Sequence, residues 1–264
     1  MNINGIEIYV DQNYVKDSKG VVIISHGLAE HCGRYDFITK KLNEANYDVI
    51  RYDQRGHGRS KGKRGKLKSF HDFIDDLHVL VLGEKKKNKK IFILGHSMGG
   101  SVVNLYAAKY GDIDGVISSG AATDTPKEAK FMKYLGFWWL RWMPKKTSFG
   151  DTLCRDESVV KAYIEDPYVL PKFYVSLAGE MFISGVRFLR KNISNITMPI
   201  LYLHGAEDEI VNPKFSRTMY EKVPATIKSI IIYENNRHEI FNDFDKEKVI
   251  GDIIYWLDSL LKNE

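Results

Sequence analysis

A serine stands between two glycines in the sequence Gly95-His96-Ser97-Met98-Gly99. An apolar run precedes this pattern, and residues 100–107 continue with small and apolar residues that are typical of a helix. A strand, a sharp turn and a helix form the elbow in which G-x-S-x-G presents a nucleophilic serine. Glycine on either side lets a strained turn close and lets a substrate approach. We therefore expect Ser97 to be a nucleophile.

A serine hydroxyl needs a base to remove its proton, and the base needs a third group to orient it. Chains with this elbow place these groups in the order serine, acid, histidine. Two strand-like runs late in the chain lead into loops that carry Asp208 and His238. Open α/β sheets place their sites just past the C-terminal ends of strands. We expect Asp208 as the acid and His238 as the base, with Glu207 and Glu209 as alternatives to Asp208.

Acyl transfer also needs two N–H groups that stabilise the oxyanion of the tetrahedral intermediate. Met98 follows the nucleophile and supplies one amide. The second amide should come from the loop after an early strand, and the run Val21–Ser25 leads into such a loop. Leu28 is the predicted donor there, with Ala29 as its nearest alternative.

The other histidines fit this chemistry less well. His96 flanks the serine and is expected to point away from it, whereas His26 and His204 end strands beside glycine and are expected to hydrogen-bond within loops. No histidine pair has zinc-ligand spacing with a carboxylate. We therefore expect no catalytic metal and no cofactor.

Short β-branched runs alternate with segments of helical period, which indicates strands separated by crossover helices. Near-continuous Val/Ile runs suit a mostly parallel sheet that is covered on both faces. An apolar stripe over 249–261 predicts a C-terminal helix. The predicted strands are Ile6–Val10, Val21–Ser25, Asp48–Arg51, Ile91–Leu94, Gly115–Ser119, Pro199–Leu203 and Lys228–Tyr233.

Between about residues 122 and 195 this alternation stops. The stretch contains a helical pattern over 172–190 and no strand signal. At 264 residues the chain is near the upper limit for one hydrophobic core. We expect a single α/β domain over 1–264, with a helical cap inserted at about 122–195 on top of the sheet.

Residues 131–143 of this insertion read FMKYLGFWWLRWM, and ten of the thirteen are large and apolar. A helix that is apolar nearly all round needs an apolar partner. That partner is either a membrane surface or acyl chain, or the protein interior if the helix is buried between sheet and lid. Trp138, Trp139 and Trp142 are the candidate lid contacts with a lipid substrate.

The net charge of +5 is concentrated in two basic stretches, residues 61–68 and 85–90. Such stretches are either solvated loops or surfaces that attract anionic lipid headgroups or acidic partners. No aromatic-interleaved basic motif or helix-turn-helix pattern accompanies them, so we expect no nucleic-acid partner.

Cys32 and Cys154 are too few for a disulfide scaffold in a chain of this length. The N-terminus lacks a basic start followed by an apolar run. No stretch reaches the roughly 18 apolar residues that a spanning helix needs. The expected location is cytoplasmic, with peripheral contact at a membrane surface through the cap left open.

Six ordered motifs resemble the monoacylglycerol lipase branch of the α/β-hydrolases, which also contains lysophospholipase-like enzymes. They are HGLAEHCGRY (26–35), YDQRGHGRS (52–60), GHSMGG (95–100), AYIEDPYV (162–169), MPILYLHGAEDEIVNP (198–213) and NRHEIFND (236–243). The resemblance implies an α/β-hydrolase fold and the triad and oxyanion residues named above. It also implies that the insertion is a mobile lid over an acyl-chain tunnel, although the insertion matches poorly outside AYIEDPYV.

These observations predict a serine esterase that cleaves monoacyl lipids such as monoacylglycerols. Ser97 would form the acyl-enzyme, and water activated on His238 would hydrolyse it. Two alternatives with the same triad are a lysophospholipase and a short-chain carboxylesterase. A non-catalytic binding protein on this fold is disfavoured because all three triad residues are present in order.

Overall fold

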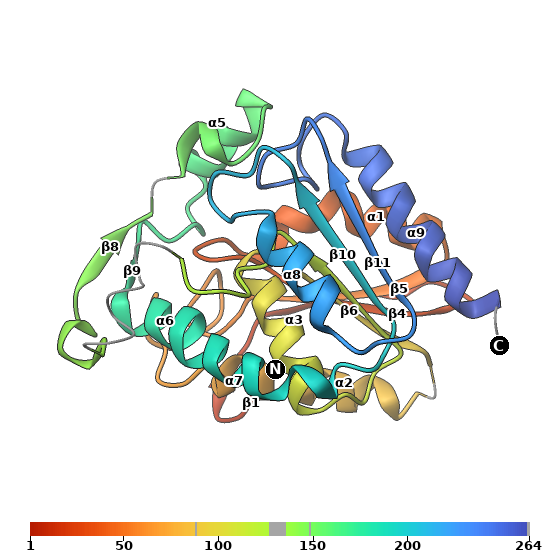
Figure 1. Ribbon diagram of the computed structural model, residues 1–264, viewed down its shortest axis with the longest axis horizontal. Coiled ribbons are helices and arrows are strands. Elements are labelled where there is room, and N and C mark those ends of the chain that lie inside the picture. Colours follow the sequence, from red (N-terminus) through yellow and green to blue (C-terminus); the bar gives the residue numbers. More distant parts are fainter. Residues whose placement is uncertain (88, 127–135, 148, 263–264) are drawn as a thin grey trace.

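Seven strands form the central sheet of the computed structural model, which describes residues 1–87, 89–126, 136–147 and 149–262 (Figure 1). Their order across the sheet is β11-β10-β7-β6-β4-β5-β3. Every neighbouring pair is parallel except β3 with β5. The strands are β3 (Val10–Asn13), β4 (Gly20–Ser25), β5 (Tyr47–Tyr52), β6 (Ile91–His96), β7 (Gly115–Ser119), β10 (Ile200–Gly205) and β11 (Lys228–Tyr233).

The strand expected over 6–10 is wrong, because the chain turns back on itself before it enters the sheet. Asn4 and Gly5 have φ angles of 49° and 78°, and this left-handed pair closes a hairpin of β1 (Asn2–Ile3) and β2 (Ile6–Glu7). Only from Val10 does the chain pair with β5. The other six strands lie where their apolar runs predict them.

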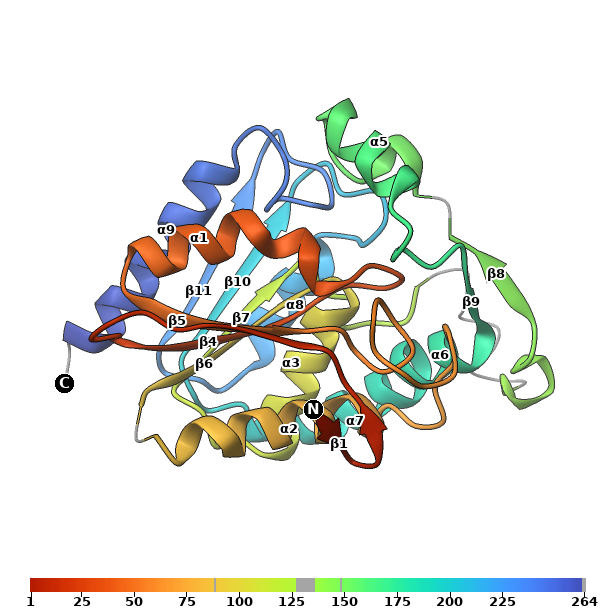
Figure 2. The same ribbon diagram turned by 180° about the vertical axis from the view of Figure 1, so that it is seen from behind.

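Helices cover both faces of the sheet (Figures 1 and 2). Successive residues of β4 explain why: Val21 and Ile23 enter one apolar core, and Val22 and Ile24 enter the other. The first core is closed by α2 (His71–Lys85), α3 (Met98–Lys109) and α8 (Lys214–Lys222), and the second by α1 (Asp36–Glu44) and α9 (Lys246–Lys262). The C-terminal helix and the two-faced burial of the sheet are thus confirmed. None of the helices in the described part of the chain is long and apolar enough to cross a membrane.

The described residues between 122 and 195 connect β7 to β10 outside the central sheet and are called the cap. Figure 1 shows α5 of this cap beyond the ends towards which the arrows of β10 and β11 point. Its described elements are η3 (Trp138–Leu140), β8 (Pro144–Lys146), η4 (Gly150–Thr152), α5 (Glu157–Glu165), β9 (Lys172–Tyr174), α6 (Val175–Gly179), the π-turn η5 (Glu180–Gly185), α7 (Val186–Asn192) and η6 (Ile193–Asn195).

The cap is not all-helical as expected, since β8 and β9 pair antiparallel within it. The sequence of β8 is Pro-Lys-Lys, which has little intrinsic preference for a strand, so this pairing depends on its tertiary setting. The helix predicted over 131–143 is also not found in the described part of that range. Residues 127–135 lie outside the described residues, and 136–143 contain only the single 3₁₀ turn η3.

The turn η3 determines which side chains between residues 137 and 142 are buried. Phe137 packs with Val175 and Ile183, and Leu140, three residues on, joins the same cluster. The three tryptophans therefore point outward, and Trp138, Trp139 and Trp142 are 57%, 89% and 61% exposed. The cap thus presents an aromatic surface to its surroundings.

Candidate active site

Ser97 lies in a sharp turn between β6 and α3 with φ 54° and ψ −116°. A side chain at Gly95 would place its Cβ 2.1 Å from the Gly99 carbonyl oxygen. One at Gly99 would place its Cβ 2.0 Å from the carbonyl oxygen of Ser25. The Ser97 amide donates to the carbonyl of Ser119 at 2.8 Å, which holds the turn against β7. The two glycines are therefore a steric requirement of the strained serine.

Asp208 and His238 meet at the C-terminal ends of β10 and β11. Nδ1 of His238 lies 2.6 Å from Oδ2 of Asp208, and both side chains are buried. The other carboxylate oxygen accepts the amides of Ile210 and Val211 at 2.9 and 2.8 Å. His238 lines the same cavity as Ser97. The structure thus brings the predicted nucleophile, base and acid together.

The alternatives to Asp208 do not share this position. Glu207 and Glu209 are exposed, whereas the Asp208 carboxylate is enclosed. Of the three acidic residues, Asp208 is the one that contacts His238.

His204 is a partner of Asp208 that the sequence analysis assigned only to loop hydrogen bonding. Its Nε2 lies 3.0 Å from Asp208 Oδ2 and 2.9 Å from the Val211 carbonyl oxygen. Both are acceptors, so Nε2 must carry the proton. Its Nδ1 lies 2.7 Å from the Ser216 hydroxyl, which holds the other side of the ring. Asp208 is therefore held by two histidines at one oxygen and two amides at the other.

The electrostatics of this pair suit a general base. Burial alone would raise the pKa of Asp208, but His238 and the hydrogen bond from His204 hold that pKa well below its usual range. Burial likewise acts to lower the pKa of His238, and the Asp208 carboxylate reverses this, so the pKa of His238 is raised. Asp208 stays ionised and favours the imidazolium that forms when His238 takes a proton.

His96 corrects a sequence expectation, because it does not point away from the site. Its ring centroid lies 4.6 Å from that of His238, and it lines the same cavity. Burial, together with the neighbouring His238, lowers the pKa of His96 to about 3. A neutral ring therefore packs beside the base.

The two predicted oxyanion amides adjoin the serine. Met98 is the first residue of α3, and the amide of a first helical residue has no acceptor within its own helix. Leu28 lines the cavity, and a Cβ on its neighbour Gly27 would lie 3.3 Å from the Ser97 Cβ. Among hydrogen bonds between described residues, none takes the Leu28 amide. Leu28 lines the cavity and Ala29 does not, so Leu28 is the better placed of the two candidates.

A buried charged network forms one side of the cavity, and the sequence analysis did not assign it. Arg34 lies between two carboxylates, at 3.1 Å from Glu30 Oε2 and 2.5 Å from Glu239 Oε2. Its guanidinium also stacks over the ring of Tyr163 from α5, 4.7 Å from the centroid. Glu30 accepts the amide of Gly27 as well, which ties the network to residues 26–31, the loop that carries Leu28 and is called the oxyanion loop after its predicted role. Glu30 lies in the motif at 26–35 and Glu239 in the motif at 236–243. These two motifs were the only sequence signal that could have pointed to the network.

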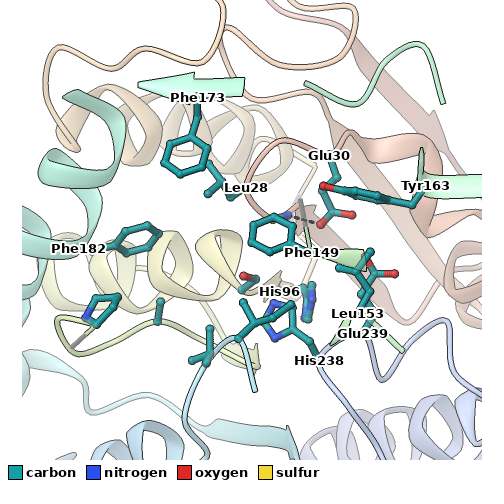
Figure 3. Close-up of a pocket in the computed structure, with 16 residues that line it drawn as sticks. Leu28, Glu30, His96, Phe149, Leu153, Tyr163, Phe173, Phe182, His238 and Glu239 are labelled. Atoms are coloured by element: carbon teal, nitrogen blue, oxygen red, sulfur yellow. Dashed lines mark hydrogen bonds between the residues drawn. The ribbon is translucent and has the colours of Figure 1, made fainter. Parts of the chain in front are cut away.

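The opposite side of the cavity is apolar. Figure 3 shows Leu28, Phe173 and Phe182 on one side and Glu30, Tyr163 and Glu239 on the other. Further apolar lining comes from Pro126, Phe149, Leu153, Ile210 and Val211. The cavity has a volume of about 140 Å³.

The three tryptophans predicted as lid contacts with a lipid substrate lie apart from the Ser97 cavity in this structure. Trp138, Trp139 and Trp142 do not line the cavity that contains Ser97. The inward positions of their turn are taken by Phe137 and Leu140, as described above. Trp142 instead lines a second cavity, which lies between the cap and residues 61–68.

In the parts of the chain that the structure describes, no group of three or more His, Cys, Asp or Glu side chains is arranged to hold a metal ion. The two cysteines are not paired with each other, and both are buried.

Residues 16–245 match the family model described as serine aminopeptidase, S33. The chain is 31% identical to the monoacylglycerol lipase of Mycolicibacterium smegmatis over 93% of its length and 90% of that protein. The chain therefore belongs to the family that this model describes as serine aminopeptidase, S33. It is a serine ester hydrolase with the α/β-hydrolase fold, which confirms the fold, the resemblance and the enzyme class expected from the sequence.

Two further similarities bear on the site. The crystal structure of Paleococcus ferrophilus monoacylglycerol lipase superposes with a TM-score of 0.85 at 31% identity, over 96% of this chain and 99% of that one. Phospholipase YtpA of Bacillus subtilis is 25% identical over 87% of this chain and 91% of its own length. The proteins similar to this chain therefore include some named as monoacylglycerol lipases and one named as a phospholipase.

Proposed function

We propose that this chain hydrolyses monoacylglycerols through an acyl-enzyme on Ser97. The observation that carries the proposal is the two-sided cavity, in which the serine and His238 lie between an apolar wall and a polar one. A monoacylglycerol has the same division, since its ester bond separates an acyl chain from a diol.

The first step is attack of Ser97 Oγ on the ester carbonyl carbon. His238 takes the hydroxyl proton at Nε2, because Nδ1 donates its own proton to Asp208. The amides of Leu28 and Met98 stabilise the oxyanion, and the C–O bond to glycerol breaks as His238 returns the proton to the leaving alkoxide. Water activated by His238 then attacks the acyl-enzyme and releases the fatty acid.

The polar wall favours a neutral glycerol head group over a phosphate-bearing one. Glu30 and Glu239 together carry two negative charges and Arg34 one positive charge, so the network is acidic overall. Carboxylates can accept hydrogen bonds from glycerol hydroxyls, whereas they repel the phosphate of a lysophospholipid. The lysophospholipase alternative is therefore the weaker one.

The cap, residues 122–195, is proposed to act as a lid. A cavity of about 140 Å³ is smaller than the roughly 300–1,000 Å³ of sites for drug-sized ligands. Phe149 and Phe173 of the cap contribute to its enclosure. A long acyl chain therefore requires these side chains to move away from the sheet.

The cap is also proposed to contact the membrane from which a lipid substrate is drawn. Trp138, Trp139 and Trp142 are more than half exposed, and such side chains favour the interface of a bilayer. Their outward orientation gives them a role in docking rather than in the cavity.

The test is a substrate panel run with a fluorophosphonate probe. Labelling of wild type and not of Ser97→Ala would support the nucleophile. The panel compares monoacylglycerols, lysophospholipids and nitrophenyl esters of matched acyl length. The proposal requires the highest kcat/KM for monoacylglycerols, and a preference for lysophospholipids or for short nitrophenyl esters only would overturn it.

A further inference from the structure

A second cavity, of about 640 Å³, lies between the basic stretch at 61–68 and the cap. It is separate from the cavity of Ser97, with which it shares no lining residue. Its walls are Ile6, Arg55, Gly62, Lys63, Lys66, Leu67, Lys68, Asp72, Arg141, Trp142 and Ser176. The esterase chemistry above uses none of these side chains.

The position of the basic stretch against the cap is fixed by close backbone contacts. Gly65 has φ 63°, and a Cβ there would lie 2.8 Å from the Lys172 carbonyl oxygen of β9. The amide of Tyr174, also in β9, donates to the Gly65 carbonyl at 2.9 Å. Within the cap, the amide of Ser176 donates to the Arg141 carbonyl at 3.2 Å, which joins two residues that line the cavity. The stretch is therefore held against the cap rather than being a free loop.

Four cations of this cavity have no ion pair with a carboxylate among the described residues: Lys63, Lys66, Lys68 and Arg141. Arg55 differs, because it pairs with Asp76 at 2.5 Å and with Asp72 at 3.5 Å. Glu180 interacts electrostatically with Arg141, and its carboxylate accepts the Phe70 amide. With Arg55 and Asp72 offsetting each other, the cavity carries an excess of four positive charges.

Aromatic rings hold two of these cations in place. Lys66 Nζ lies 4.8 Å from the Trp142 ring centroid and 4.1 Å from that of Tyr174. The Arg141 guanidinium lies 5.1 Å from the same Trp142 ring. Cations over aromatic faces are positioned without being neutralised. They keep their charge available for an anion.

A buried hydroxyl adds a hydrogen-bonding group. Ser176 is 6% exposed and lines the cavity. Its Oγ has no hydrogen-bond partner among the described residues. A buried hydroxyl without a partner is uncommon in folded proteins and is explained when a ligand supplies the partner.

We propose that this cavity binds the phosphate of an anionic lipid headgroup and so orients the cap on a negatively charged membrane. The inference rests on the membrane contact proposed above for the cap, to which it adds a specific site. Trp142 belongs to both features: it is exposed on the docking surface and it lines the cavity. A bilayer in contact with the tryptophans therefore presents its headgroups to Lys63, Lys66 and Arg141.

The test measures sedimentation of the full chain with vesicles of phosphatidylcholine alone and with about a third phosphatidylglycerol. The site variants are Lys63→Gln/Lys66→Gln and Lys66→Gln/Arg141→Gln. The control is Lys16→Gln/Lys86→Gln, which removes the same charge from two exposed lysines outside the cavity. Melting temperature and turnover of a short soluble ester should be unchanged in all three variants, since none touches the Ser97 cavity.

The site predicts that each removed cation weakens binding to anionic vesicles about fivefold, because a cation near such a surface contributes about 1 kcal/mol. Each site variant should therefore lose about 25-fold, while the control loses much less and binding to phosphatidylcholine is unchanged. Equal losses in site and control variants would mean diffuse attraction and would overturn the site. A second result would also overturn it. If inorganic phosphate changes the tryptophan fluorescence but the site variants bind vesicles like wild type, the cavity is a site for free anions and not for a lipid headgroup. Failure of wild type to bind phosphatidylcholine would instead count against the membrane contact proposed for the tryptophans.

Discussion

Nε2 of His204 lies 3.0 Å from Oδ2 of Asp208, the same oxygen that accepts from His238. One carboxylate oxygen therefore receives two N–H groups, and the position of His238 depends on a residue that does not line the Ser97 cavity. We infer that His204 is a positioning residue for the acid.

Replacing His204 by Phe should lower kcat about 10- to 100-fold with little change in KM, because small displacements of catalytic groups are costly. His204→Gln should recover most of the loss, since its amide can donate to Asp208. Ser216→Ala, which removes only the outer partner of His204, is the matched control and should have a smaller effect. Equal activity in the Phe and Gln variants would show that the hydrogen bond is unimportant.

Ser97→Ala and His238→Ala should each lower kcat by roughly 10³-fold or more, because nucleophile and base act as a unit. The double variant should be scarcely worse than either single one. Steady-state hydrolysis of a monoacylglycerol measures this, with circular dichroism to confirm that each variant is folded. Near wild-type turnover by either single variant would remove that residue from the mechanism.

The pH dependence of kcat/KM should report the raised pKa of His238. The base must be neutral, so activity should rise with pH through that pKa, and the midpoint should lie above the ordinary histidine value of about 6.5. In Asp208→Asn the carboxylate that raises the pKa is gone, and burial then favours the neutral ring. The midpoint should therefore move to lower pH while the plateau falls by about 10⁴-fold. A midpoint that stays in place would mean that Asp208 does not set the pKa of His238.

Much of the sheet and the positions of the triad could be predicted because their signals are local. A strand buried on both faces, such as β4, is a continuous apolar run, and Ser97, Asp208 and His238 follow such runs directly. The strands β8 and β9 could not be predicted, since their pairing depends on tertiary contact rather than on the sequence Pro-Lys-Lys.

The same reasoning explains the missed polar groups. Arg34 and Glu239 are 205 residues apart, and the contact of His204 with Asp208 looks like any loop hydrogen bond until the fold is known. Motif 26–35 marked Glu30 and Arg34 as part of a resemblance, but it did not indicate that they face the substrate. Long-range side-chain contacts leave no periodic trace in the chain.

The segment after α5 is attached to the oxyanion loop at two points, which gives a fourth prediction. Nε2 of His31 lies 2.7 Å from Oδ2 of Asp166, and the Leu170 amide donates to the Ala29 carbonyl at 2.8 Å. Asp166→Ala should lower kcat/KM about tenfold for both long and short esters, because the Leu28 amide loses its alignment. Glu165→Ala, an exposed neighbour, should leave both rates unchanged. A loss confined to long-chain esters would place the effect in the cap and not in the oxyanion loop.

The last prediction concerns the outward tryptophans of the cap. If Trp138, Trp139 and Trp142 dock on a lipid surface, each contributes by burying apolar area, up to about 3 kcal/mol for a large side chain that becomes fully buried. Replacing each by Glu should lower kcat/KM for long-chain monoacylglycerols presented in vesicles far more than for a short, soluble ester. Trp139, which is 89% exposed, should show the largest change in this ratio with the smallest change in melting temperature.

The short ester is the internal control, because the triad and its cavity are untouched by these changes. Phe137→Glu is the contrasting variant, since its buried ring packs with Val175 and Ile183 and a charge there should unfold the cap and depress both rates together. The two outcomes separate docking from packing. A long-to-short ratio that is unchanged in all three well-folded tryptophan variants would exclude a role for this surface in reaching the substrate.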